Sequence, residues 1–405
     1  MNRIVLIGNG FDLAHGLKTS YKDFIEWYWE QRVKSFHGNL SSISEDILCQ
    51  LKFLNHGIWN VYAYNHIPTI NPPKGSAIIE SIINNQDAFK VKKSTFFQNI
   101  THCVETLGWV DIENEYYSLL KDYAINHIDT GVLQLNKELK YIQDLLVRYL
   151  GEIKNEGIKI KENLKKRLYE PINEKDVSVE ATAILKANND FFLSKDSLTW
   201  QIKASSFGLT ESQIMDYLND AEEYKSARRL NQKTPALFRL PDKIMFLDFN
   251  YTSTTHEYII PDNPSFIHNH IHGQLEQPET VIFGYGDEMD EQFKLIQSLN
   301  KEEYLKNIKS INYLNSSNYR QVLKFIEFAP FQIYIMGHSC GNSDRTLLNT
   351  LFEHKNCISI KPFFYVKDDG SDNYIELVQN ISRNFTDMKL MRDRVVNKNY
   401  CETMS

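Results

Sequence analysis

The chain has 405 residues and a formal net charge of −7, and its 42% hydrophobic content is enough for one large core or two ordinary ones. The acidic balance gives no electrostatic reason to expect nucleic acid as the main partner, and no apolar stretch reaches the roughly 20 residues that cross a bilayer. The five cysteines are scattered without a C-x-x-C pair, so we expect neither a disulfide framework nor a cysteine zinc ribbon, and we expect a cytoplasmic protein.

The first predicted element is a strand over Ile4–Ile7, whose four consecutive apolar residues suit burial on both faces. Gly8 and Gly10 follow it and allow backbone amides to approach another group closely, as in nucleotide-binding loops. Leu13 stands where the dinucleotide fingerprint has its third glycine, and Asp12 adds a negative charge. The pattern therefore predicts either a nucleotide site or a tight structural turn between strand and helix.

Residues 25–240 are predicted to be mostly helical. Thr210 and Gln213 match a capping box that opens a helix through about Ser226. A second helix is indicated by apolar residues at three- and four-residue spacing, namely Leu135, Leu139, Ile142, Leu145, Leu146 and Tyr149.

Further strands are expected in the carboxyl-terminal part of the chain, at Ile244–Phe249, Phe266–Ile271, Val281–Phe283, Gln332–Met336 and Ile358–Val366. These strands predict an α/β fold of Rossmann-like type with a mostly parallel sheet. We expect residues 1–24 and 241–405 to form its core and residues 25–240 to form a large helical insertion or cap.

A polar turn follows the strand that ends at Phe249. Asn250 is expected at the carboxyl tip of that strand, where open α/β sheets bind ligands. Its amide could hold a sugar hydroxyl or a water molecule. The alternative is an Asx-type turn that satisfies only local backbone groups.

Three histidines alternate along the next predicted strand. The period of a strand puts His268, His270 and His272 on one face, as in a metal site with nitrogen ligands. Alternatively, His272, which precedes Gly273 at the strand end, is a single catalytic base. A third interpretation gives these histidines no chemistry.

A glycine-rich loop from Gly337 to Asp344 follows the strand at Gln332–Met336. Ser339 or Ser343 could cap the next helix or bind a ribose, and a plain structural loop is the alternative. The run from Gly337 to Gly341 also fits the Gly-x-Ser-x-Gly pattern of a nucleophile elbow. The only histidine downstream is His354, in the predicted next helix, which disfavours a serine hydrolase.

Together these motifs resemble the bacteriophage abortive-infection family AbiH. The matching segments occur in order over nearly the whole chain, at 8–13, 20–24, 109–113, 249–252, 271–273, 337–339 and 343–344. The resemblance implies antiphage defence in bacteria.

The order of the motifs also resembles sirtuin-type Rossmann domains and their NAD-cleaving relatives in defence. That resemblance implies that Asn250 holds the nicotinamide ribose and a water molecule and that His272 acts on the ribose hydroxyl, with NAD as the substrate. As a third catalytic residue we expect Asp12, facing the sugar or nicotinamide end of the ligand. Thr252 stands where sirtuins carry an aspartate, and the zinc ribbon of deacetylating sirtuins is missing, so we do not expect protein deacetylation. The resemblance implies that Gly8, Gly10, Gly337 and Ser339 meet the phosphates and the adenosine ribose of the dinucleotide. We expect the rest of the nucleotide-binding set to be Asn9, Phe11, Thr252, Ser343 and Asp344.

The leading hypothesis is a protein that hydrolyses NAD on infection, with no metal, in response to a phage-derived activator or partner protein. Homo-oligomer formation is left open, and no membrane or nucleic-acid partner is expected. The first alternative is a nucleotide sensor without catalysis. The second is a metal-dependent hydrolase that uses His268, His270 and His272.

Overall fold

The computed structural model describes residues 1–35, 43–54, 89–153, 158–227, 233–367 and 369–404. Contacts between residues divide the chain into two compact units. The first unit comprises residues 1–17, 155–282 and 312–405, and the second comprises residues 18–154 and 283–311. Residues 155–240, which the sequence analysis assigns to the helical insertion, group with the sheet in this division.

The first unit is built on a five-stranded, all-parallel sheet with the strand order β6-β5-β1-β7-β8. This order corresponds to strands 3-2-1-4-5 of the doubly wound nucleotide-binding folds. The predicted α/β fold with a mostly parallel sheet is therefore confirmed. The strands are β1 (Asn2–Ile7), β5 (Ile244–Asp248), β6 (Phe266–His270), β7 (Phe331–Met336) and β8 (Cys357–Phe363).

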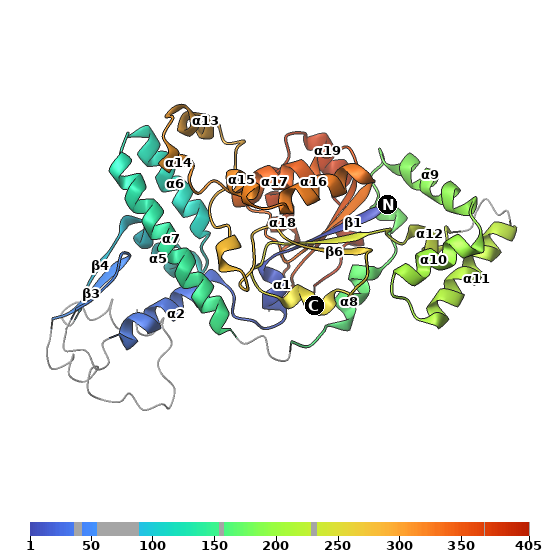
Figure 1. Cartoon of the computed structure of the whole chain (residues 1–405), viewed down its shortest axis with the longest axis horizontal. Coiled ribbons are helices and arrows are strands. Elements are labelled where there is room, and N and C mark those ends of the chain that lie inside the picture. Colours follow the sequence, from blue (N-terminus) through green and yellow to red (C-terminus); the bar gives the residue numbers. More distant parts are fainter. Residues whose placement is uncertain (36–42, 55–88, 154–157, 228–232, 368, 405) are drawn as a thin grey trace. The chain divides into compact units, whose positions relative to one another are not determined.

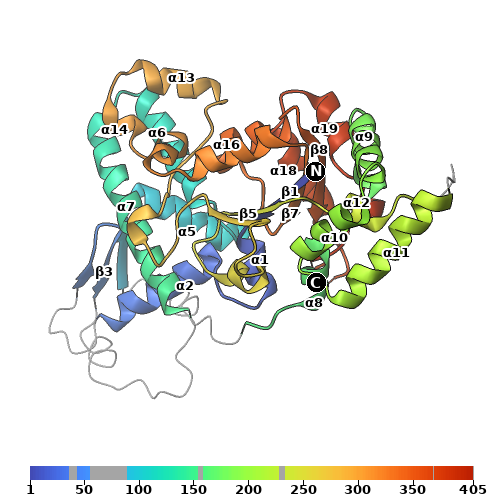
Figure 2. The same ribbon diagram turned by 45° about the vertical axis from the view of Figure 1, so that its right-hand side comes forward.

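Each face of this sheet carries its own hydrophobic core, because residues of the central strands alternate between the two faces. Ile4 and Leu6 of β1 belong to one cluster, and Val5 and Ile7 belong to the other. Figures 1 and 2 show α16, α17 and α19 above the sheet and α1 and α8 below it. The bounds are α1 (Asn9–Ala14), α8 (Glu162–Tyr169), α16 (Asn318–Phe328), α17 (Arg345–Phe352), α18 (Tyr374–Arg383) and α19 (Met388–Arg394).

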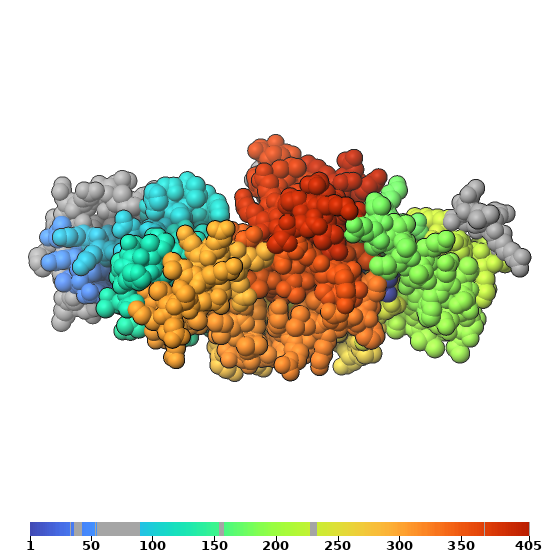
Figure 3. Space-filling model, turned by 90° about the horizontal axis from the view of Figure 1, so that it is seen from above, coloured from blue at the N-terminus to red at the C-terminus, as the bar shows by residue number. Residues whose placement is uncertain are grey.

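The described part of the first unit also contains the helices α9 to α12, and Figure 3 shows green atoms of this segment beside the C-terminal segment in red. The backbone N–H of Val179 donates to Asp393 over 2.9 Å, which joins the two segments. The predicted capping box is confirmed, since Thr210 and Gln213 bond each other's backbone N–H. The helices are α9 (Thr182–Leu193), α10 (Ser197–Ser206), α11 (Glu211–Ala227) and α12 (Ala236–Arg239).

The second unit combines helices with a small antiparallel sheet of order β2-β3-β4. The helix predicted from Leu135 to Tyr149 is confirmed as part of α7. The three short strands were not predicted, because their sequences are short and half polar. The elements are α2 (Tyr21–Lys34), β2 (Ile43–Glu45), β3 (Cys49–Phe53), β4 (Phe89–Lys93), α5 (Thr95–Leu107), α6 (Ile112–Ile125), α7 (Asp129–Glu152), α13 (Glu291–Ser298) and α14 (Glu302–Leu305). The helix α15 (Lys309–Asn312) spans the boundary between the units.

The strand prediction at Val281–Phe283 is wrong. These residues are buried, but they follow a 3-10 turn at Pro278–Thr280 and form no strand. The backbone N–H of Ile282 donates to the carbonyl of His272. Burial in an irregular segment thus explains the apolar run. In the part of the chain that the structure describes, no helix combines the length and apolarity needed to cross a membrane.

Candidate functional site

The loops that follow β1, β5, β6 and β7 meet at one edge of the sheet, because the carboxyl ends of parallel strands point the same way. Each loop contributes polar side chains that are at least nine-tenths buried. These side chains are Asp12, Asn250, His272, His338 and Asp344, with exposed fractions between 1% and 8%. Buried polar groups at the carboxyl edge of such a sheet define the candidate site.

The two glycine loops contact each other directly at this edge. The backbone N–H of Gly10 donates to the carbonyl of Gly337 over 2.9 Å. A Cβ atom on Gly8 would lie 2.5 Å from the Cα of His338, and one on Gly337 would lie 2.1 Å from the backbone nitrogen of Phe11. Gly337 also has a φ of +79°, which disfavours any other residue. The sequence predicted that another group approaches these glycines closely. In this structure that group is the backbone of the other glycine loop.

The loop after β5 is hydrogen-bonded to the segment after β1 through Asn250 and Thr252. The Asn250 side chain donates to the carbonyl of Gly8 over 3.1 Å, and its backbone N–H donates to the carboxylate of Asp248 over 3.0 Å. The hydroxyl of Thr252 donates to Oδ2 of Asp12 over 2.6 Å. Asn250 thus ties the tip of β5 to the first glycine loop.

The Asp12 carboxyl group is only 1% exposed. Burial raises the pKa of Asp12 to about 6, while hydrogen bonds from Thr252 and Thr254 act in the opposite direction. A carboxyl group with this pKa can change its protonation state near neutral pH. Such a group suits acid–base chemistry or the stabilisation of a positive charge on a ligand.

His272 lies in a second polar group, on the other core of the sheet. Its Nε2 atom is 3.2 Å from the hydroxyl of Tyr313 and 3.2 Å from Oδ1 of Asp344. The other carboxylate oxygen of Asp344 is 3.6 Å from Nε2 of His338. The ring of Phe249 packs against both imidazoles, with centroids 5.1 and 4.1 Å away. A carboxylate between two imidazoles can orient His272 as a general base.

His338 and Tyr313 are members of this group that the sequence analysis did not single out. His338 has a fixed orientation, because its Nδ1 atom accepts the backbone N–H of Cys340 over 3.0 Å. His338 could have been identified from the sequence, because it directly follows Gly337 at the end of a predicted strand, where ligands are bound. Tyr313 comes from a 3-10 turn before α16 and had no such indication.

The remaining predicted binding residues lie in different environments. Phe11 is fully buried and packs against the rings of His15 and Tyr258, as a core residue does. Asn9 and Ser339 are exposed, whereas Ser343 is buried in the 3-10 turn that precedes α17.

The three alternating histidines do not share one environment. β6 ends at His270, and the chain then turns, with a φ of +83° at Gly273, so the alternation of a strand stops before His272. His268 and His270 lie beside Asp248, and Nε2 of His268 is 3.1 Å from Oδ2 of that carboxylate. The third member of the group around His268 and His270 is therefore Asp248, and not His272 as the alternation of the histidines predicted.

A serine hydrolase would need His354 within hydrogen-bonding reach of Ser339, and the structure places the two far apart. The ring of His354 packs on Phe331, the first residue of β7, whereas Ser339 follows the last residue of that strand. At about 3.3 Å per residue, the length of β7 separates the two side chains by roughly 20 Å. His354 cannot activate Ser339 across the sheet.

Comparison with protein families matches residues 4–366 to the model described as bacteriophage abortive infection AbiH. No curated protein and no solved structure matches the chain. The match covers both glycine loops, the turn after β5 and the loop after β6, and it confirms the family resemblance on which the sequence analysis relied. The family description implies a role in abortive infection against phage. The chain belongs to the bacteriophage abortive infection family AbiH.

Proposed function

We propose that this abortive-infection protein binds NAD at the carboxyl edge of its sheet and hydrolyses the bond between nicotinamide and ribose. The observation that carries the proposal is that Asp12, Asn250 and His272 are all buried at that edge, in the segments that follow β1, β5 and β6, although His272 lies on the other core of the sheet from Asp12. The Rossmann strand order and the raised pKa of the buried Asp12 carboxyl group support it further.

The reaction needs a stabilised ribose cation and a water molecule that attacks it. The C1′–N1 bond breaks, its electron pair stays on the nicotinamide nitrogen, and an oxocarbenium-like ribose remains. In this proposal the Asp12 carboxylate faces that charge, and Asn250 positions the ribose and the water. His272, oriented by Asp344, takes the proton as the water oxygen bonds to C1′. The products are ADP-ribose, nicotinamide and one proton.

The direct test is nicotinamide release from NAD by the purified full-length protein, with and without extract from phage-infected cells. Asn250→Ala is expected to lower the rate at least about 100-fold, as for the loss of one positioning group. Asn219→Ala, at an exposed position on α11, is the matched control and should keep the full rate. Full release by the Asn250→Ala protein, or none by the wild type under any condition, contradicts the proposal.

The direct contact between the glycine loops favours a second candidate, a nucleotide sensor without catalysis. A ligand that separates Gly10 from Gly337 would break the 2.9 Å hydrogen bond between them and change the first turn of α1. This candidate predicts that NAD or another nucleotide raises the melting temperature without any product. His272→Ala would then leave phage protection intact, whereas the NAD-hydrolysing protein would lose it.

A further inference from the structure

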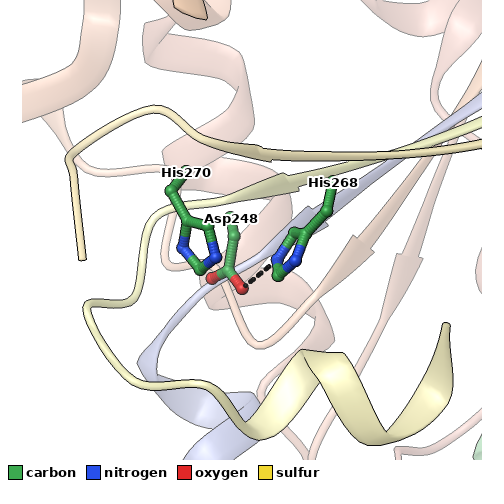
Figure 4. A group of neighbouring side chains, drawn as sticks. All are labelled: Asp248, His268 and His270. Carbon is green, nitrogen blue, oxygen red and sulfur yellow. Dashed lines mark hydrogen bonds and ion pairs between the residues drawn. The ribbon is translucent and has the colours of Figure 1, made fainter. Parts of the chain in front are cut away.

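Three side chains with metal-binding atoms lie together at the end of the β5–β6 pair, on the face of the sheet opposite to His272. Asp248 is the last residue of β5, and His268 and His270 alternate along β6, with His270 in register beside Asp248. Figure 4 shows both imidazoles turned toward the Asp248 carboxylate. One donor atom from each residue lies within 4.8 Å of the other two.

The spacing of these atoms is close to that of ligands sharing one ion. Zinc binds imidazole nitrogen and carboxylate oxygen at about 2.0–2.2 Å, so two ligands at the tetrahedral angle lie about 3.3–3.6 Å apart. The distance of 3.1 Å between His268 Nε2 and Asp248 Oδ2 is close to this separation. Side-chain rotations that move the donor atoms by up to about 1.5 Å would bring a pair at the 4.8 Å limit to the same separation.

The surrounding protein does not provide a hydrogen-bond partner for every polar atom of this group. The side chain of Asp248 is 0% exposed, and Nδ1 of His270 is buried without a hydrogen-bond partner. A buried carboxylate beside two imidazole rings supplies the oxygen and nitrogen donors that bind a divalent transition-metal ion, whose charge would compensate the buried carboxylate.

We propose that Asp248, His268 and His270 bind a divalent transition-metal ion, with Zn²⁺ as the best-fitting candidate. Two nitrogen ligands and one oxygen leave the fourth tetrahedral position for water or for His256, whose exposed ring lies 5.5 Å from that of His268. The ion departs from the metal-free expectation, and its binding can be measured without NAD cleavage. Because Asp248 also accepts the backbone N–H of Asn250, the metal would fix the turn that carries Asn250.

The test is the zinc content and zinc affinity of the full-length protein. Wild type dialysed against micromolar Zn²⁺ is expected to retain one equivalent more than His268→Gln and His270→Gln, measured by elemental analysis. Each variant should weaken that site at least about 100-fold in a competition titration with a chromophoric chelator. His102→Gln, an exposed histidine on α5, is the matched control and should bind like the wild type.

X-ray absorption at the zinc edge tests the wild type without any variant. The expected first shell contains two imidazole nitrogens and one or two oxygens near 2.0–2.2 Å, or a third imidazole if His256 is the fourth ligand. A sulfur ligand, no retained zinc, or equal retention by the wild type and both histidine variants overturns the proposal. Asp248→Asn preserves an acceptor for the Asn250 N–H, so loss of zinc from that variant, with near-UV circular dichroism unchanged, is a further expected result.

Discussion

The contact between the two glycine loops gives a direct prediction for Gly337→Ala. Gly337 has a φ of +79°, and a methyl group there would lie 2.1 Å from the backbone nitrogen of Phe11 and 2.6 Å from the carbonyl carbon of Gly10. Both neighbours are backbone atoms of α1, which cannot move aside like a flexible side chain. The substitution must therefore push the two loops apart or distort α1.

The expected cost follows from two contributions. The left-handed conformation costs an alanine about 1–2 kcal/mol, and forcing a methyl group into filled space costs about 1–3 kcal/mol more. Gly16 separates the two, because it has nearly the same φ of +80° with nothing within 4 Å of its would-be Cβ. Gly16→Ala should pay only the conformational cost. Gly337→Ala should therefore lower the free energy of unfolding by about 1–3 kcal/mol more than Gly16→Ala.

The two variants are compared by urea denaturation at one pH, with amide hydrogen exchange as a local probe. The N–H of Gly10, which donates to the carbonyl of Gly337, should exchange faster in Gly337→Ala and remain protected in Gly16→Ala. Equal destabilisation of the two variants, with Gly10 equally protected, would refute the reasoning. It would mean that the two loops are not in contact in solution.

Two further predictions concern buried charges. The pKa of Asp12 is raised from 3.8 to about 6, so the folded state holds this proton more tightly and wild-type stability falls as pH rises through that window. Relative to Asp12→Asn, which does not titrate, the wild type should lose about 1.4 kcal/mol between pH 5 and pH 7.5 in denaturant titrations, and a flat difference would contradict the raised pKa. Glu113→Ala should cost about 3 kcal/mol in thermal or urea unfolding, because it removes the carboxylate 2.9 Å from the buried ammonium of Lys309. Asp144→Ala, which breaks an exposed ion pair on α7, is its control and should change stability little; equal effects would count against the buried pair.

The parallel strands could be predicted because their signal is local. Short apolar runs bounded by polar residues predicted β1, β5, β6, β7 and β8 to within a few residues, except that the predicted end at Val366 lies beyond Phe363. The same rule failed at Val281–Phe283, since an apolar run records burial and not hydrogen-bond pairing. It also missed β3 and β4, whose alternating polar residues form a small sheet only through antiparallel pairing within the second unit.

The candidate site could be predicted in part. The rule that ligands meet the carboxyl ends of parallel strands indicated Asp12, Asn250 and His272 from three separate segments. It could not reveal that the Asp344 carboxylate lies between His272 and His338, because that contact depends on how the loop after β7 folds back. The same rule could not show that His268 and His270 lie beside Asp248 and not beside His272, because that depends on where β6 ends.

The α/β class, the strands of the sheet and their polar carboxyl ends could be predicted without a structure, because each is encoded in a contiguous run of residues, and the family could be recognised from the order of such runs. The groups that the glycines of the first loop approach became known only from the folded chain. Gly8 and Gly10 indicate that another group packs closely against the first loop. That group includes the backbone of Gly337, more than 320 positions away in the chain. A glycine leaves room for a close contact because it has no Cβ atom, but the identity of the contacting atoms depends on how the whole chain folds.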